Sequence, residues 1–417
     1  MLLEFSFKNF RSFPDETALD MTAMKMTEHE DSVVTVAGER VLPIAALFGA
    51  NASGKSNVYS AFAYMSHMVL NSFQYGDDPQ GYQAAYPEPF LFDAASAEED
   101  SSFEVYFTLA GDEKEKTYNY GFSMNRDEIT EEWLNVKART AREYRKIFFR
   151  NHDRLAMPGL TEAGRTNIST SLNPQVLVVS LGSKLRVDKC KVVRDWFLQN
   201  ELANFGDTLR TFMMSKVMPD HFAEDVSVQK RVLGYLNAFD DSIRAFRVEK
   251  VPQTKEDSRE GYKIFTAHQL KGHDKYVWIP LEAESAGTLK MFGLYSRLEE
   301  VLARGSVFFI DELNARLHPL LVRSFLQIFL NPEQNPNHAQ LIFTTHDAWQ
   351  LSSNLLRRDE IWFTEKNKDG ASSLFSLADF EDEDGNRIRK DENFEKNYLW
   401  GKYGAIPHMK ALVGGGV

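Results

Sequence analysis

The residues best suited to chemistry lie near the start of the chain, in the segment Gly49–Ser56. Its sequence, GANASGKS, fits the phosphate-binding pattern G-x-x-x-x-G-K-[ST] at every fixed position. In such a loop the glycines let backbone N–H groups approach phosphates, the lysine reaches the β- and γ-phosphates, and the serine can hold Mg²⁺. We expect the following residues to bind nucleotide, with Ser56 also binding the metal: Gly49, Asn51, Ser53, Gly54, Lys55, Ser56 and Asn57.

The flanking segments provide the setting that a phosphate-binding loop requires. Residues 41–48 form a nearly unbroken apolar run, which is typical of a buried parallel strand. After the serine, Val58, Phe62 and Met65 recur at spacings of three and four residues, which predicts a helix. The order of strand, glycine-rich loop and helix argues against a chance match.

Paired carboxylates, Asp311 and Glu312, follow the apolar run of residues 307–310. A buried strand that ends in aspartate delivers a carboxylate to the edge of a sheet, where it can coordinate Mg²⁺. The next residue is then placed to act as a general base on the attacking water. An apolar run before Asp-Glu is common by itself. Downstream of a phosphate-binding loop it predicts Asp311 as a metal ligand and Glu312 as the catalytic base.

A second candidate anion site lies at Ser285, Gly287 and Thr288, directly before a helical pattern that begins at Leu289. Small residues at a fresh helix N-terminus can bind an anion through backbone N–H groups. Because Lys55 already serves the phosphates of this chain, a second site makes sense only for the nucleotide of another chain. The alternative is an ordinary helix cap, for which serine and threonine are good residues.

The strand predicted at residues 341–345 ends in His346. A histidine there could sense the γ-phosphate and orient Glu312 or the water, although a lone histidine after a strand is usually structural. Between the two strands, the loop of residues 313–319 follows the predicted base directly and would lie where two protomers meet, so Asn314 is a candidate to bind nucleotide there. His318 in that loop could instead cap the next helix.

In chain order these residues resemble the ABC-type ATPases of the RecF, SMC and OLD group. That family combines a Walker A loop (here Gly49–Ser56), a signature at a helix start (Ser285–Thr288), Walker B with its glutamate (Asp311–Glu312), a D-loop (Asn314–His318) and a switch histidine (His346). The resemblance implies ATP and Mg²⁺ as ligands. It also implies that ATP is sandwiched between two protomers, with the signature of one facing the Walker A loop of the other.

Three further segments extend the resemblance. Residues 9–13 are similar to the opening of the same family, which implies that Arg11 lies near the nucleotide. Residues 356–366 and 398–407 are similar to stand-alone ATPases of bacterial anti-phage and abortive-infection systems, such as RloA and AbiL. The chain departs from the family pattern at the D-loop, which has Asn314 in place of the usual aspartate, and Gln83 is only a candidate for the Q-loop.

We therefore expect an α/β fold, an ABC-type P-loop ATPase head with a mixed sheet, an antiparallel β lobe and a helical insertion. The expected parts are an N-terminal half of the head (1–165), a helical insertion (166–250) and a C-terminal half of the head (251–417). No sustained heptad pattern is present, so no long coiled coil is expected. The start of the chain does not resemble a signal peptide, and its single cysteine suits a reducing cytoplasm.

Two functions from different classes follow from the resemblance. The first is an ATPase that forms homo-oligomers and regulates a separately encoded effector, such as a nuclease, in anti-phage defence. OLD proteins carry a C-terminal nuclease domain, whereas only 71 residues follow His346 here, so we expect the effector to be a different chain. The alternative is a DNA-repair ATPase that clamps DNA, which a net charge of −12 disfavours without excluding. The basic residues within 137–150 could bind nucleic acid, but a solvated edge hairpin is the simpler interpretation.

Overall fold

The computed structural model describes residues 1–406 except 76–85, 113, 208, 210–212, 215–216, 240, 252–260, 382–384 and 386. Gln83, the Q-loop candidate, lies outside the described residues. No helix within the described ranges is long and apolar enough to cross a membrane. The longest helix among the described residues, α8, has 19 residues. No long coiled coil occurs within the described ranges.

A six-stranded sheet at the centre of the molecule has the order β11-β15-β16-β5-β17-β18, in which only β18 runs antiparallel to its neighbour. Its strands are β5 (Ile44–Phe48), β11 (Glu201–Asn204), β15 (Val307–Asp311), β16 (Gln340–Thr344), β17 (Ile361–Lys366) and β18 (Ser372–Ser376). Every residue of β5, β15 and β16 is buried, as expected for parallel strands covered on both faces. The parallel arrangement brings the carboxyl ends of these strands to one edge, where the predicted site residues follow.

A seven-stranded antiparallel sheet forms the second layer, in the order β10-β9-β8-β7-β6-β1-β2. Its strands are β1 (Leu2–Lys8), β2 (Thr17–Asp20), β6 (Ser101–Thr108), β7 (Lys116–Met124), β8 (Ile129–Ala138), β9 (Arg145–Asn151) and β10 (Leu155–Ala156). This sheet is the antiparallel lobe that the sequence predicts. Beside it, β3 (Val34–Val36) and β4 (Glu39–Val41) make a short separate hairpin.

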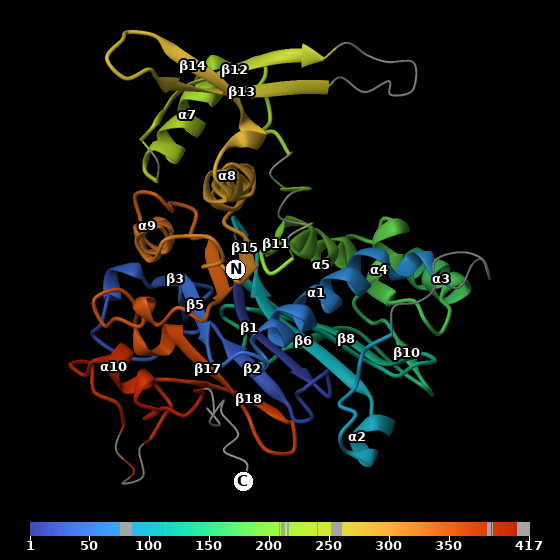
Figure 1. Cartoon of the computed structure of the whole chain (residues 1–417). Helices are drawn as coiled ribbons and strands as arrows, with labels where there is room; N and C mark the ends of the chain where they lie inside the picture. Colours follow the sequence, from blue (N-terminus) through green and yellow to red (C-terminus); the bar gives the residue numbers. More distant parts are fainter. Residues whose placement is uncertain are drawn as a thin grey trace, which may run out of the picture.

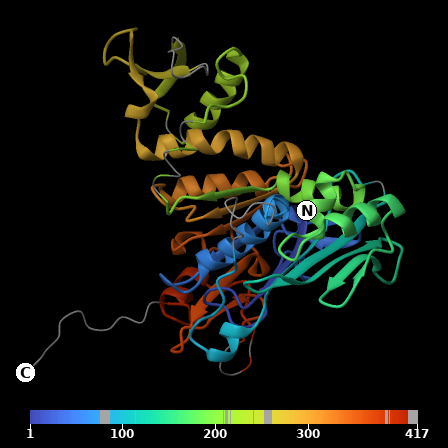
Figure 2. The same cartoon turned by 90° about the vertical axis from the view of Figure 1, so that its right-hand side faces the viewer.

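Helix α1 (Lys55–Asn71) lies between the two sheets (Figures 1 and 2). The ring of Phe62 in α1 packs 5.2 Å from Phe5 of the antiparallel sheet and 5.9 Å from Phe309 of the central sheet. This aromatic packing on both faces holds α1 between the two sheets. The helix begins at Lys55, near the carboxyl end of β5 and within the predicted phosphate loop.

The opposite face of the central sheet is covered by α8 (Ala286–Arg304) and α9 (Pro319–Leu330). Beyond α8, α7 (Val226–Asn237) packs on a three-stranded sheet of β12 (Ile243–Val251), β13 (Gly261–Gln269) and β14 (Tyr276–Pro280), which forms an arm at one end of the molecule (Figure 2).

The predicted insertion, 166–250, contains helices and strands that belong to different layers. Its first helices, α3 (Glu162–Ser171), α4 (Val178–Lys184) and α5 (Asp188–Gln199), pack with the antiparallel sheet and α1. Strand β11 then joins the central sheet beside β15, while α7 and β12 belong to the arm. The proposed domain boundaries remain a prediction.

Within the basic segment 137–150, exposure differs from residue to residue. Arg142, Arg145 and Lys146 are exposed around the β8–β9 turn, in agreement with a solvated hairpin. Arg150 is buried, and its Nη1 donates to the backbone oxygen of Val176 at 2.7 Å. The guanidinium also lies near Glu132 and helps to stabilise its carboxylate inside the protein. Arg150 is therefore a structural residue and is not part of an exposed basic surface.

Glu132 of β8 holds the start of α4. It is fully buried, and its carboxylate accepts hydrogen bonds from the backbone N–H groups of Val178 and Val179 and from the hydroxyl of Tyr120. A carboxylate at a helix N-terminus satisfies N–H groups that have no partner within the helix. Burial raises the pKa of Glu132 to about 7, against the opposing influence of Arg150 and the two N–H groups.

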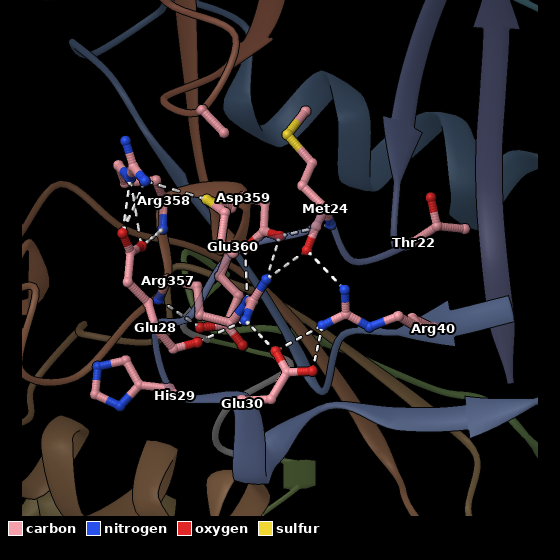
Figure 3. Close-up of polar contacts among 12 residues, drawn as sticks. Thr22, Met24, Glu28, His29, Glu30, Arg40, Arg357, Arg358, Asp359 and Glu360 are labelled. Atoms are coloured by element: carbon pink, nitrogen blue, oxygen red, sulfur yellow. Dashed lines mark hydrogen bonds and ion pairs between the residues drawn. The ribbon is translucent and has the colours of Figure 1, made fainter. Parts of the chain in front are cut away.

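A buried ionic network joins the N-terminal segment to the residues that lead into β17 (Figure 3). Arg357 is 0% exposed, and its guanidinium bonds both carboxylate oxygens of Asp359 at 2.8 and 2.9 Å. It also donates to the backbone oxygens of Glu28 and Met24. Glu360 accepts from the backbone N–H of Arg357, and burial raises its pKa to about 8. The network fixes the loop before β3 against the short helix η5 (Arg358–Glu360).

Candidate nucleotide-binding site

The loop between β5 and α1 has a backbone that only glycine tolerates at two points. Gly49 has φ 149° and Gly54 has φ 120°. A Cβ at Gly49 would lie 2.5 Å from the backbone oxygen of Thr364, and one at Gly54 would lie 2.9 Å from the ring of Phe13. Both positions therefore need glycine for their dihedral angles and for space.

Lys55 projects into the loop that it follows. Its Nζ donates to the backbone oxygens of Gly49 at 2.7 Å and Ala50 at 2.9 Å. Burial lowers the pKa of Lys55, whereas Glu312 and Asp311 act in the opposite direction. A hollow of about 560 Å³ opens here, lined by Asn51, Ala52, Gly54, Lys55, Ser56, Asn57, Glu312, His346 and Lys366. The geometry brings the predicted phosphate loop, base and switch histidine around one space.

Ser56 and Asp311 meet at the end of the loop. The Ser56 hydroxyl donates to Oδ1 of Asp311 at 3.0 Å, and the Thr344 hydroxyl donates to the same oxygen at 2.6 Å. Burial raises the pKa of Asp311, while these two hydrogen bonds lower it. No cluster of three or more His, Cys, Asp or Glu side chains suited to a metal occurs among the described residues. One hydroxyl beside one carboxylate fits Mg²⁺, which takes few protein ligands and several oxygens from substrate and water.

The second carboxylate is held by a chain of polar contacts. Glu312 has φ 59°, an uncommon value for a residue other than glycine, and its backbone N–H donates to the Thr344 hydroxyl at 2.8 Å. Its Oε2 lies 3.1 Å from Nδ1 of His346, whose Nε2 lies 3.0 Å from Nδ2 of Asn314. The Thr345 hydroxyl donates to Asn314 at 2.9 Å. The predicted base, switch histidine and D-loop asparagine thus form one connected group.

Ser53, Asn57 and Arg11 each bond a residue outside the phosphate loop, and of these three Asn57 alone lines the hollow. The Ser53 hydroxyl bonds the Thr364 hydroxyl at 2.5 Å, and Nδ2 of Asn57 donates to Ser12 at 2.7 Å. Arg11 donates to the hydroxyl of Ser60, one turn into α1, and forms an ion pair with Glu88. Arg11 does not line the hollow. Its predicted proximity to nucleotide stays a prediction.

The predicted signature residues form the start of α8. The Ser285 hydroxyl accepts from the backbone N–H of Thr288 at 3.1 Å and lies 2.8 Å from the Thr288 hydroxyl. Ser285 is therefore the N-cap of the helix, the alternative that its sequence left open. Ser285, Gly287 and Thr288 are not among the residues that line the hollow around Lys55. The helix cap is compatible with an anion site for another chain, because the Ser285 hydroxyl engages one backbone N–H of the helix start, that of Thr288.

Sequence reasoning missed Thr344, Thr364 and Lys366. Thr344 links the carboxylate of Asp311 to the backbone N–H of Glu312, and its position directly before Thr345 and His346 in the predicted strand was an available signal. Thr364 and Lys366 reach the site because β17 pairs with β5, a contact between segments more than 300 residues apart. No local pattern announces that pairing.

Comparison with known proteins supports an ATPase domain. A protein-family profile described as "AAA domain, putative AbiEii toxin, Type IV TA system" matches residues 44–348, which is well over half of the chain. No curated protein matches the chain. A solved structure of the recombination mediator protein RecF with ATP shares 12% identity over 90% of this chain and 97% of that chain, with a TM-score of 0.31. Since the profile spans the phosphate loop, both carboxylates and the switch histidine, the chain belongs to this family of AAA-domain ATPases.

Proposed function

We propose that this protein is an Mg²⁺-dependent ATPase that sandwiches ATP between two protomers and regulates a separately encoded effector, such as a nuclease, in anti-phage defence. The proposal rests on one observation: the predicted catalytic residues and the predicted signature residues lie at separate places in the same chain. The phosphate loop, Glu312 and His346 line one hollow, with Asp311 bonded to Ser56 beside it, whereas Ser285–Thr288 lies outside it on another helix end. That helix end has no nucleotide to serve in its own chain, so we assign it to the nucleotide of a second protomer.

The residues in and beside the hollow that we assign to catalysis have contacts that support their roles. Lys55 binds the β- and γ-phosphates, and the loop N–H groups bind the phosphate oxygens. Glu312 accepts a proton from the attacking water, while His346 holds the carboxylate through its 3.1 Å contact. Ser56 and Asp311 would hold Mg²⁺, which when bound offsets the negative charge of the phosphates. The D-loop asparagine, Asn314, keeps His346 in place.

The defence role rests on the family and on the resemblance of residues 356–366 and 398–407 to anti-phage ATPases. The matched family carries a toxin of a type IV toxin–antitoxin system in its description. We therefore propose that ATP-dependent assembly of this protein controls a partner chain.

The sandwich is tested with Ser285→Arg. A bulky cation at the start of α8 leaves the hollow of its own chain intact but obstructs the nucleotide of a partner. We expect nucleotide affinity close to that of the unmodified protein, together with loss of ATP-dependent oligomers and of hydrolysis. Normal hydrolysis by Ser285→Arg chains that sedimentation shows to be monomeric would refute the sandwich.

The effector is tested with tagged Glu312→Gln, which we expect to bind ATP without hydrolysing it. The tagged protein is recovered from its native host with ATP, and bound proteins are identified by mass spectrometry. Lys55→Ala serves as the control that cannot bind ATP. A stoichiometric protein bound to Glu312→Gln but not to Lys55→Ala supports the proposal. Recovery of DNA alone, removed by nuclease treatment, would favour the DNA clamp instead.

A further inference from the structure

A buried lysine connects the start of α8 to the turn that carries the proposed catalytic base. Lys290 lies just after the start of α8 and is only 1% exposed. Its Nζ donates to the backbone oxygens of Leu313 at 2.6 Å and Ala315 at 2.9 Å, and lies 3.9 Å from the ring centroid of Phe205. Burial lowers the pKa of Lys290 to about 7, while Glu312 acts to raise it. A charged group is costly at such a place, so its contacts define what it does there.

The turn that Lys290 holds has an unusual backbone. Glu312 and Arg316, at its two ends, have φ values of 59° and 62°, the left-handed region that residues with a Cβ avoid. Both acceptors of the ammonium, Leu313 and Ala315, lie between these two residues. Strained backbone of this kind persists only where surrounding contacts fix it. Lys290 supplies two of those contacts, and through them it fixes where the carboxylate of Glu312 can lie.

The other end of the connection is the start of α8. Ser285 and Thr288 cap this helix end. A Cβ on Gly287 would lie 3.3 Å from the backbone oxygen of Arg316, so the helix start and the turn are in close contact. Displacement of the helix start therefore displaces Lys290 and the turn with it.

We propose that Lys290 is a positioning residue that couples the start of α8, where the nucleotide of a second protomer binds, to Glu312 of its own chain. This inference rests on the proposed function, since it requires the helix start to contact that nucleotide. The inference states which protomer acts on which in the assembly. ATP held by one protomer places the base of the other, so the two sites hydrolyse ATP cooperatively.

Lys290→Met in the full-length protein tests the proposal, because methionine keeps the apolar stem over Phe205 and removes the ammonium. We expect the affinity for a fluorescent ATP analogue, measured at low protein concentration, to stay within about twofold of the unmodified protein. We expect kcat to fall about 10- to 100-fold, as for a misplaced catalytic group. The Hill coefficient for ATP should fall from above one to one. A residue with a purely structural role would not alter cooperativity selectively.

Arg304→Met is the matched control, since Arg304 is an exposed cation at the far end of the same helix, paired with Glu300. It should hydrolyse ATP with unchanged kcat and cooperativity. If Lys290→Met does not fold, Lys290→Gln, which keeps one donor, carries the same test with a smaller expected loss. Unchanged kcat and Hill coefficient in either variant overturn the inference while the ATPase proposal stands. Failure of the unmodified protein to hydrolyse ATP overturns the proposed function instead.

Discussion

Replacement of Arg357 by methionine should destabilise the protein more than any change to a surface cation. The guanidinium is completely buried and makes two charge-assisted hydrogen bonds to Asp359, itself 3% exposed. It also satisfies the backbone oxygen of Glu28, while Met24 retains a second donor, Arg40. Removal of one partner of a buried ion pair costs about 3–5 kcal/mol, because the remaining charge is left in a poorly solvated place.

The assay is urea unfolding of Arg357→Met beside Arg389→Met. Arg389 pairs with Asp391, but the two side chains are 78% and 65% exposed, so its loss should barely move the transition. A double variant, Arg357→Met with Asp359→Leu, removes both charges and should regain part of the lost free energy of unfolding. If Arg357→Met unfolds at the same urea concentration as Arg389→Met, the buried network does not stabilise this joint and the reasoning fails.

The pH dependence gives an independent check on the same network. Burial raises the pKa of Glu360 to about 8, and its ordinary value is 4.5. Between these values the folded chain keeps a proton that the unfolded chain releases, so this group lowers the free energy of unfolding as pH rises from about 4.5 to 8. In Arg357→Met the decline should continue above pH 8, because loss of the nearby positive charge raises the pKa of folded Glu360 further, while its slope stays limited to one proton. A free energy of unfolding that falls less between pH 4.5 and 8 in Glu360→Gln than in the unmodified protein would assign the difference to Glu360.

Three further outcomes follow from the described contacts. Lys55→Ala should abolish binding of a fluorescent ATP analogue, since the lysine supplies the charge inside the phosphate loop; retained binding at the original affinity would place the nucleotide elsewhere. Thr344→Val should keep nucleotide binding but reduce kcat, because the partly buried N–H of Glu312 loses this acceptor, at about 1–3 kcal/mol for an unsatisfied group, while Asp311 keeps the hydrogen bond from Ser56; an unchanged kcat in single-turnover assays would show that this bridge does not position the base. In the unmodified protein, stability should fall between pH 4.5 and about 7, because folded Glu132 keeps a proton that the unfolded chain releases. In Glu132→Gln this fall should be smaller; melting temperatures that decline equally with pH in both proteins would contradict that assignment.

The sequence predicted the local elements of the site and missed the contacts between distant segments. The apolar runs before Gly49, Asp311 and His346 each formed a buried strand, because a continuous run of apolar residues requires cover on both faces. The adjacency of those strands brings their polar ends together. Lys366 joins them only through the pairing of β17 with β5, for which no residue pattern exists. Arg150 was misplaced because a basic segment does not reveal that one of its cations turns inward to the carbonyl of Val176.

Two buried cations, Arg357 and Lys290, each bond a segment that is distant from them in sequence or carries a site residue. These contacts explain how a site assembled from distant parts keeps its geometry. Arg357 fixes the residues that lead into β17, which supplies Thr364 against the phosphate loop. Lys290 fixes the turn that carries Glu312. An apolar contact at either joint would tolerate a small slip, because dispersion and burial have little directional preference. Hydrogen bonds from a buried cation do have direction, and their loss leaves partners unsatisfied. The catalytic carboxylate and the phosphate loop are thus each held in place by a cation that we do not expect to contact nucleotide.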